Sequence, residues 1–324
     1  HPRLTTGAPA PISSIHTSIH TFGPVRRAAG TVSAMTDALG FDGKVAIITG
    51  AGGGLGREHA LMMAHRGALV VVNDLGGAID GTGSDKGAAE RVVDEIKAAG
   101  GEAVADTNSV ATVEGGAAIV QTALDAFGRI DIVVNNAGIL RDKSFHNMTP
   151  DLWGPVLDVH LNGAYHVTSA AWPHMREQGY GRVVSTASGA GIFGNFGQAN
   201  YGAAKMGLVG FSRVLAVEGA SKNIKANVIA PVARTRMTED LLGPLADKVD
   251  PKMVSPIVTY LAHESCEATG RIFSVAGGRV AEIFIAEGPG YVDDELSPES
   301  IAANWDQVTN QDGYEVPSQM GDEI

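Results

Sequence analysis

The sequence predicts an α/β fold, in which short buried parallel strands alternate with helices. Short apolar runs bounded by glycine recur along the chain, a pattern typical of strands buried on both faces of a sheet. Stretches with helical spacing of apolar residues separate these runs. With 324 residues, 44% of them apolar, and 42 glycines, the chain can bury a sizeable core and make many tight turns. We expect one large domain over residues 41–284.

The composition narrows the class of function. A net charge of −12 argues against nucleic acid or an anionic membrane as a partner. Cys266 is the single cysteine, so no intrachain disulfide can form and a reducing compartment is favoured. No apolar run approaches the roughly 18–20 residues of a membrane span. We expect a cytoplasmic protein, with a peroxisome or another organelle as the alternative.

Residues 1–40 do not resemble a folded element. Residues 1–34 hold arginine but no Asp or Glu, and they are rich in Ser, Thr, Ala and Pro. This composition resembles an organelle transit peptide, and it equally fits sequence upstream of a start at Met35. We expect residues 1–40 to be a disordered or non-native leader.

The domain begins with a strand, a glycine loop and a helix. Lys44–Thr49 is apolar enough for a buried strand, Gly50–Gly56 is the loop, and a helical pattern covers 57–66. In this geometry the free N–H groups at the start of a helix meet a phosphate. The glycine spacing is T-G-x-x-x-G-x-G, and its place after a strand strengthens the nucleotide-binding interpretation.

The second strand, Ala68–Asp74, ends in a carboxylate eighteen residues after Gly56. Such a group can accept hydrogen bonds from a ribose 2′-hydroxyl and would repel a 2′-phosphate, so it predicts NAD over NADP. Asp74 is also a good turn residue before the glycine-rich loop 75–84, and the two roles are compatible. A charged helix over 85–99 and a third strand over 102–107 follow.

The middle of the chain is expected to bring polar residues to the ligand-binding edge of the sheet. A helix near 112–127 leads into a fourth strand over 130–134, which ends in Asn135-Asn136-Ala137-Gly138. Thr149-Pro150-Asp151 caps a long helix that runs to about Gln178. The fifth strand, 181–186, delivers Ser188 to the same edge, and a loop rich in glycine follows it.

Tyr201 and Lys205 are four residues apart on a helix expected over 198–221, so both side chains lie on one face. An ammonium group one turn away favours the tyrosinate and lowers the tyrosine pKa. With the Ser188 hydroxyl beside them, they would form an acid/base site for interconverting a carbonyl and an alcohol. Taken alone, a YxxxK spacing more commonly marks a half-buried aromatic and a solvated lysine.

The last third of the chain completes the domain. A sixth strand over 224–230 ends at Pro231, and residues 232–262, with helical stretches near 238–248 and 251–262, are expected to form a mobile lid. A seventh strand is expected over 271–275, and 285–324 is expected to be an extension with a short helix near 298–308. The spacing of His263, Cys266 and Glu267 matches no tetrahedral metal site, so we expect no metal.

Four motifs in order identify a resemblance to a known family. These are TGAGGGLG at 49–56, NNAG at 135–138, Ser188, and YGAAK at 201–205. Together they resemble the short-chain dehydrogenase/reductase family over about residues 40–280. The resemblance implies a Rossmann-type, doubly wound, seven-stranded parallel sheet with helices on both faces. It also implies a nicotinamide cofactor and a homodimer or homotetramer.

A narrower resemblance rests on longer stretches. These are VVVNDLGG (70–77), TALDAFGRID (122–131), NNAGILRDKSF (135–145), GNFGQANYGAAK (194–205), AHESCE (262–267) and PESIAANW (298–305). They look like the (3R)-hydroxyacyl-CoA dehydrogenase part of peroxisomal multifunctional enzyme type 2 and its bacterial stand-alone relatives.

The family's functional residues carry over by motif. Tyr201 would be the general acid/base, Lys205 would lower its pKa and bind the nicotinamide ribose, and Ser188 would hold the substrate oxygen. The other implied cofactor contacts are Gly50, Gly54, Leu55, Gly56, Asp74, Asn108, Ser109, Asn136, Ala137 and Gly138.

Three positions depart from the family pattern. The family usually has Asn within a V-N-L run to hold a relay water, but His160 stands there, as it does in the narrower subgroup. Asn108 replaces the Asp that usually contacts adenine. Val232 replaces the Gly that usually follows Pro231, which predicts a different loop beside the nicotinamide.

The leading hypothesis is NAD-dependent oxidation of a (3R)-3-hydroxyacyl-CoA to the 3-ketoacyl-CoA. The alternatives are a steroid or another secondary alcohol as substrate, and a non-catalytic NAD-binding or scaffold protein. CoA is anionic and needs cationic contacts. Position alone suggests Arg141, Lys143, Arg234, Arg236 and Arg271.

Overall fold

The computed structural model describes residues 39–85, 87–234 and 248–322. Of the expected leader, only Leu39 and Gly40 fall within these ranges. The helix expected over 238–248 lies outside them except for its last residue.

The described residues include an eight-stranded sheet with the order β3-β2-β1-β4-β5-β6-β7-β8. Strands β1 to β7 are parallel, so the expected doubly wound α/β class is confirmed. Their bounds are β1 Val45–Thr49, β2 Leu69–Asn73, β3 Glu102–Asp106, β4 Ile132–Asn135, β5 Gly181–Thr186, β6 Ile224–Val232, β7 Ile272–Ala276 and β8 Arg279–Ile283.

The number of strands differs from the seven expected, because β8 pairs antiparallel with β7. The turn between them consists of Gly277 (φ 52°) and Gly278 (φ 81°). Two consecutive residues with positive φ form the type of turn that matches the twist of a hairpin, and glycine adopts that conformation without strain. A Gly-Gly pair between two apolar runs was therefore a readable hairpin signal.

The strand order reverses at β1, which lies between β2 and β4. The chain winds outward from β1 to β3 on one side and from β4 to β7 on the other. Helices that leave β1 and β4 therefore diverge to opposite faces, and a crevice opens at the carboxyl ends of these two strands. The reversal of strand order therefore determines where a ligand can bind at the carboxyl ends of the strands.

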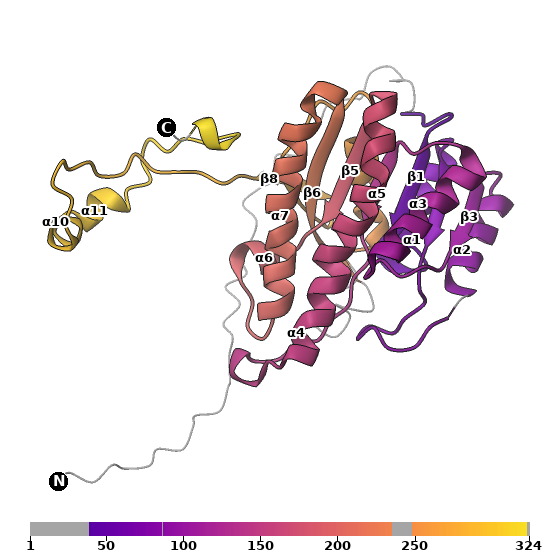
Figure 1. Cartoon of the computed structure of the whole chain (residues 1–324), viewed down its shortest axis with the longest axis horizontal. Helices are drawn as coiled ribbons and strands as arrows, with labels where there is room; N and C mark the ends of the chain where they lie inside the picture. The colour runs from indigo at the N-terminus through magenta and orange to yellow at the C-terminus, as the bar shows by residue number, and fades with distance from the viewer. Residues whose placement is uncertain (1–38, 86, 235–247, 323–324) are drawn as a thin grey trace, which may run out of the picture. The chain divides into compact units, whose positions relative to one another are not determined.

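Helices cover both faces of the sheet. One buried apolar cluster joins the sheet to α1 (Gly54–His65), α2 (Gly87–Ala98) and α9 (Ser255–Ala262). The other joins it to α3 (Val113–Phe127), α5 (Gly163–Gln178) and α7 (Ala199–Gly219). Figure 1 shows α5 and α7 in front of β5 and β6. The shorter helical segments include η1 Phe145–Asn147, η3 Ala220–Lys222, η5 Pro251–Met253 and η6 Met320–Asp322.

The long helix expected to end near Gln178 contains a change of winding. It consists of α4 (Pro150–Leu157), a five-residue π-helical segment (Asp158–Asn162) and α5. His160 is buried in that π-helical segment. Such segments are rare and occur frequently at functional sites. The segment after Ser188, expected to be a loop, contains the short helix α6 (Gly189–Phe193), whose first turn is capped by the Ser188 side chain.

The described half of the expected lid is packed into the domain. Val258 and Leu261 of α9 are buried in the core, and Ser255 Oγ lies 2.8 Å from Nδ1 of the buried His59 on α1. Residues 251–262 are thus tied to the helix that begins at the glycine loop.

The C-terminal extension contains α10 (Pro298–Ala303) and α11 (Trp305–Val308). It contacts the domain where Arg213 Nη2 donates to the Pro317 carbonyl at 2.8 Å. The Tyr314 ring stacks on Phe284 with ring centroids 5.9 Å apart. No helix in the described part of the chain combines the length and apolarity needed to cross a membrane.

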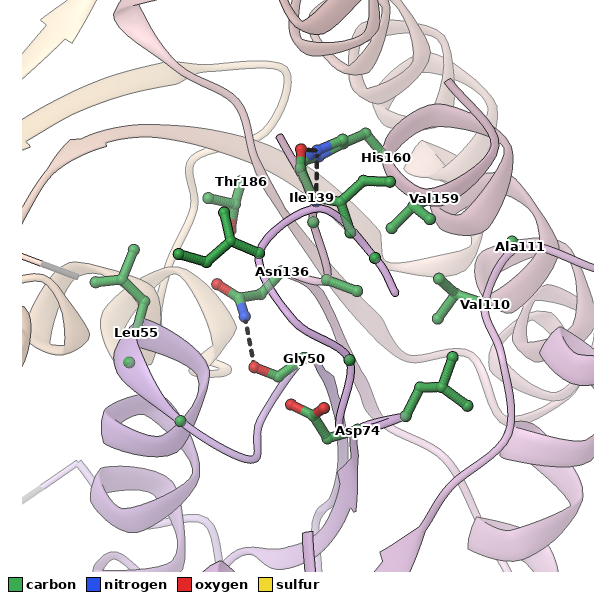
Figure 2. A pocket seen from close by; sticks show the side chains of 18 of the residues that line it. Gly50, Leu55, Asp74, Val110, Ala111, Asn136, Ile139, Val159, His160 and Thr186 are labelled. Atoms are coloured by element: carbon green, nitrogen blue, oxygen red, sulfur yellow. Dashed lines mark hydrogen bonds between the residues drawn. The ribbon is translucent and has the colours of Figure 1, made fainter. Parts of the chain in front are cut away.

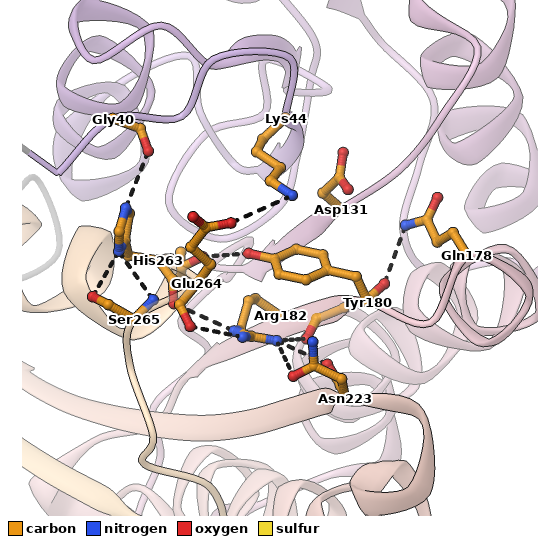
Figure 3. A network of polar contacts seen from close by, with 12 residues as sticks. Gly40, Lys44, Asp131, Gln178, Tyr180, Arg182, Asn223, His263, Glu264 and Ser265 are labelled. Atoms are coloured by element: carbon orange, nitrogen blue, oxygen red, sulfur yellow. Dashed lines mark hydrogen bonds and ion pairs between the residues drawn. The ribbon is translucent and has the colours of Figure 1, made fainter.

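At the amino ends of the strands, on the side of the sheet away from the glycine loop, a buried guanidinium group joins two strands (Figure 3). Arg182 is 1% exposed, and its Nη1 donates to the carbonyls of Gly181 and Asn223, both at 2.8 Å. The Tyr180 ring lies between Lys44 Nζ, 4.0 Å from its centroid, and Arg182 Cζ, 4.4 Å away. The network ties the start of β5 to the start of β6, which is a structural role.

Candidate active site

A cavity of about 400 Å³ opens at the carboxyl ends of the central strands (Figure 2). It lies at the crevice created by the strand-order reversal between β1 and β4, where open α/β sheets bind ligands. Its lining includes Gly50, Gly54, Leu55, Asp74, Asn108, Ser109, Asn136, Ala137, Gly138, His160, Tyr201 and Lys205. These residues come from segments far apart in the sequence, and only the fold brings them together.

The glycine loop leaves the start of α1 open. Gly53 is the N-cap, no side chain caps the helix, and its first turn holds no acidic residue. The first N–H groups of a helix have no partner within the helix, so here they are available to an anion. Asn136 steadies the loop, because its Nδ2 donates to the carbonyls of Thr49 at 3.0 Å and Gly50 at 3.1 Å. This arrangement fits the pyrophosphate of a dinucleotide.

Asp74 lies at the end of β2, in the position expected for an adenosine ribose contact. Gly52 N donates to Oδ2 at 2.7 Å, and Gly76 N donates to Oδ1 at 2.6 Å. Each carboxylate oxygen keeps a further lone pair for a ribose hydroxyl. The carboxylate thus orders the glycine loop on one side and the start of the loop 75–84 on the other.

Two of the expected site residues do not line the cavity. Gly56 lies behind the loop, where a Cβ would come within 2.3 Å of the Gly50 carbonyl oxygen, so its role is close packing. Ser188 is not among the lining residues, but its hydroxyl acts to lower the pKa of Tyr201, and its Oγ accepts from Ala190 N at 3.2 Å. Asn108 does line the cavity, with its Nδ2 donating to Asp106 Oδ2 at 2.8 Å.

Tyr201 and Lys205 share a face of α7, as their spacing predicts. Lys205 Nζ lies 5.4 Å from the Tyr201 ring centroid and donates to the Thr186 carbonyl. Burial lowers the pKa of Lys205 to about 7. Burial raises the pKa of Tyr201, which outweighs the lowering by the Ser188 hydrogen bond, and the Asp142 charge raises it further. The expected lowering of the Tyr201 pKa by Lys205 is therefore absent from this state of the site, because desolvation dominates.

His160 lies beside Tyr201, with the two rings edge to face and their centroids 5.2 Å apart. Ile139 N donates to Nε2 at 3.0 Å, and Nε2 lies 2.8 Å from the Ile139 carbonyl oxygen. Nδ1 is buried and has no partner among the described residues. Burial and the Lys205 charge hold the pKa of His160 well below its usual value, so the ring is neutral. A Cβ at Gly138 would lie 2.3 Å from Cε1, so this contact requires glycine.

Sequence reasoning missed Asn200 and gave Arg141 a different role, although both residues organise the site. Asn200 is fully buried directly before Tyr201, and it bonds to three backbone groups. Arg141, expected as a CoA contact, instead donates to the carbonyls of Asp80 at 2.9 Å and Asp151 at 2.8 Å. An Asn adjacent to the motif tyrosine was the available signal for the first. The partners of Arg141 are carbonyls distant in sequence and give no signal.

Among the other expected cations, one has an ionic partner and one lies outside the described residues. Arg271 pairs with Glu282 at 2.6 Å. Arg236 lies outside the described residues. The CoA contacts that the sequence suggested therefore stay predictions.

Comparisons with known proteins agree with this geometry. A family model described as short chain dehydrogenase matches residues 44–243. A short-chain type dehydrogenase/reductase of Mycobacterium tuberculosis is 52% identical over 279 residues, covering 86% of this chain and 98% of that protein. The peroxisomal multifunctional enzyme type 2 of Drosophila melanogaster is 51% identical over 278 residues, covering 84% of this chain and 46% of the enzyme. The chain thus spans about half of that enzyme, and both resemblances noted in the sequence are confirmed.

A solved structure supports the same fold. The complex of a 7α-hydroxysteroid dehydrogenase with NADH and 7-oxo glycochenodeoxycholic acid has a TM-score of 0.67 and 30% identity to this chain. The match covers 76% of this chain and 97% of that one.

Proposed function

Because this chain belongs to the short-chain dehydrogenase/reductase family, we propose that it is an NAD-dependent dehydrogenase acting on (3R)-3-hydroxyacyl-CoA. The product would be the 3-ketoacyl-CoA, as in fatty-acid or sterol side-chain β-oxidation. The reaction class rests on the position of Tyr201, which lines the cavity beside His160, 5.2 Å away between ring centroids, and Lys205, whose Nζ lies 5.4 Å from its ring centroid. The substrate class is supported by the likeness to multifunctional enzyme type 2.

The mechanism assigns each side chain one task. The nicotinamide would supply hydride-transfer chemistry when bound. Tyr201 takes the hydroxyl proton of the substrate during oxidation and returns it during reduction. Ser188 holds the same substrate oxygen, and Lys205 favours the tyrosinate once a ligand aligns its ammonium. His160, being neutral, orients the Gly138–Ile139 backbone and keeps Nδ1 for the proton relay expected at this position.

The choice of NAD over NADP rests on Asp74. Its carboxylate is held by two backbone amides and faces the cavity, so a 2′-phosphate would meet a fixed negative charge. We expect NADH to bind at least about tenfold more tightly than NADPH, a difference of about 1.4 kcal/mol. Fluorescence titration of both cofactors measures this preference directly.

The deciding experiment follows NADH absorbance at 340 nm with paired (3R)- and (3S)-3-hydroxyacyl-CoA. NADH formed only from the R form would support the proposal. Tyr201→Phe should lower turnover by about 10²- to 10⁴-fold, the usual contribution of general acid/base catalysis. Turnover close to that of the unmodified enzyme in this variant would contradict the mechanism.

A steroid alcohol is the second candidate substrate, favoured by the likeness to a hydroxysteroid dehydrogenase of known structure. Three exposed phenylalanines, Phe145, Phe193 and Phe196, stand in the segments that follow β4 and β5, and they suit either an acyl chain or a steroid. A substrate panel separates the two. A protein that binds NADH but turns over neither class would revive the scaffold hypothesis.

We also propose that the chain forms a homodimer or homotetramer through α5 and α7. Exposed apolar side chains on these helices include Tyr165 on α5 and Met206, Val214 and Val217 on α7. Sedimentation velocity tests the assembly. The cytoplasmic location remains a prediction, with a peroxisome as the alternative that the Drosophila relative's name suggests.

A further inference from the structure

Residues 76–85, named the strap here, form a closed loop between β2 and α2. At its base, Asp85 N donates to the Gly76 carbonyl at 2.8 Å. Gly76 has φ 74°, and a Cβ there would lie 2.1 Å from the Asp85 carbonyl oxygen, so only glycine permits this closure. At its tip, Ala78 N donates to Thr82 O at 2.8 Å, and Asp80 Oδ1 accepts from Thr82 N and Oγ1. The strap is therefore internally ordered.

The tip of the strap is fastened to the segment that follows β4. Leu140 N donates to the Ile79 carbonyl at 2.8 Å, and Arg141 Nε donates to the Asp80 carbonyl at 2.9 Å. A Cβ at Gly81 would lie 3.1 Å from Ile139 Cδ1, so the backbone packs directly against that side chain. Two hydrogen bonds and one apolar contact thus join segments about sixty residues apart in sequence.

The strap spans the length of the cavity that is proposed to bind the cofactor. It starts next to Asp74, whose carboxylate also bonds the glycine loop, and its tip is fastened beside Ile139. Figure 2 shows Asp74 near Gly50 and Ile139 near His160, at opposite ends of the cleft. Gly77, Ala78, Ile79 and Gly81 of the strap line the cavity itself.

Arg141 connects the strap to α7, the helix that carries Tyr201 and Lys205. Its Nη1 donates to the Asp151 carbonyl at the start of α4, at 2.8 Å. Its own carbonyl accepts from Asn200 Nδ2 at 2.9 Å, one residue before Tyr201. One residue thus contacts the strap, α4 and α7.

We propose that Arg141 is a positioning residue that clasps the strap across the cofactor cleft, so that cofactor release requires this contact to break. The inference rests on the proposed nicotinamide-binding function of the cavity. Its basis is that a charged donor bonding a carbonyl stabilises the closed strap more than a neutral donor does. The closed strap adds contacts over the cofactor that an open strap lacks, so closure slows dissociation.

The structure supplies a matched control for this role. Arg91 on α2 also binds the strap, but it does so at the base, where Nη2 pairs with Asp85 Oδ2 at 2.6 Å. Both side chains of that pair are well exposed, so the pair contributes little. Arg91→Ala therefore removes an arginine from the same loop without touching the fastened tip.

The test is the dissociation rate of NADH, measured by stopped-flow fluorescence after mixing the binary complex with excess NAD. Arg141→Ala should raise the rate by about 3- to 10-fold, the effect of losing one net hydrogen bond from a solvent-exposed donor. Arg141→Lys should give a smaller increase than Arg141→Ala, because a lysine can still donate to one of the two carbonyls although it cannot reach both. Arg91→Ala should stay within about twofold of the unmodified protein.

Hydrogen exchange of the strap gives a second readout that needs no cofactor. The amides of Ala78 and Gly81 are hydrogen-bonded within the strap, and they should exchange faster in Arg141→Ala than in Arg91→Ala. A rate of NADH release within twofold of normal in a folded Arg141→Ala, with unchanged strap exchange, would overturn the inference. If Arg141→Ala does not fold, Arg141→Lys decides by the same criterion. Absence of NADH binding by the unmodified protein would instead refute the proposed function. Amide hydrogen exchange in the strap would still test whether Arg141 holds the strap closed.

Discussion

Replacing Asn200 with alanine is expected to lower the free energy of unfolding by about 3 kcal/mol, through the loss of three buried hydrogen bonds. The side chain is fully buried directly before Tyr201. Its Nδ2 donates to the carbonyls of Arg141 at 2.9 Å and Leu152 at 2.8 Å. Its Oδ1 accepts from Tyr201 N at 2.7 Å. The amide therefore joins α7 to α4 and to the segment that holds the strap.

The magnitude follows from the groups left behind. Each net hydrogen bond contributes about 1 kcal/mol, and a buried group left without a partner costs about 1–3 kcal/mol. Alanine removes all three bonds and leaves the N–H group of Tyr201 without its partner. The N–H of Tyr201 lies in the first turn of α7, where no helical carbonyl can replace the lost partner. Water entering the new space would recover part of the loss, so the lower end of the summed range applies.

Urea unfolding, monitored by circular dichroism at a fixed protein concentration, measures this loss. Asn162→Ala is the matched control, because Asn162 donates one exposed hydrogen bond to Asp158 Oδ1 and should cost less than about 1 kcal/mol. Turnover of Asn200→Ala should also fall, because the backbone N–H of Tyr201 loses its hydrogen bond to Asn200 Oδ1. A destabilisation of Asn200→Ala no larger than that of Asn162→Ala would refute the reasoning.

Two further predictions concern pH and buried charge. Burial lowers the pKa of Lys205 from 10.5 to about 7. Between pH 7 and pH 10.5 the folded protein therefore binds fewer protons than the unfolded chain, so stability rises with pH over this range. At pH 7 the buried amine lowers the free energy of unfolding. Lys205→Met should therefore raise the free energy of unfolding at pH 7 by at least about 1 kcal/mol while abolishing turnover. A Lys205→Met protein that unfolds at a lower urea concentration than the unmodified protein would contradict this. Burial also lowers the pKa of His59 from 6.5 to about 3 and holds that of His160 well below its usual value, so stability should fall as pH drops below 6.5. Between pH 6.5 and 5 His59 should contribute about 1.6 kcal/mol of loss and His160 should add to it, and His59→Phe should remove the His59 share of that slope in urea unfolding at both pH values.

The parts of the fold that depend on local sequence could be predicted from the sequence. The apolar runs became β1 to β7, because strands buried on both faces consist of apolar residues. The glycine loop led into α1, which begins at Gly54, three residues earlier than expected. The π-helical segment at His160 was not predicted, because its residues also suit an α-helix. The hairpin that adds β8 was missed although Gly277-Gly278 marked it.

The sequence by itself determined which chemical groups this protein carries and the order in which they occur. Ser188, Tyr201, Lys205 and Asp74 were all readable, because each belongs to a motif whose spacing reflects one strand end or one helix face. Only the tertiary structure decided how those groups are tuned and held. Desolvation controls the pKa of Tyr201 and Lys205, and it depends on what packs around them. The contacts of Arg141 are made to backbone carbonyls of distant segments, and every residue carries such a carbonyl. For that reason no pattern of residue types in the sequence could predict the contacts of Arg141.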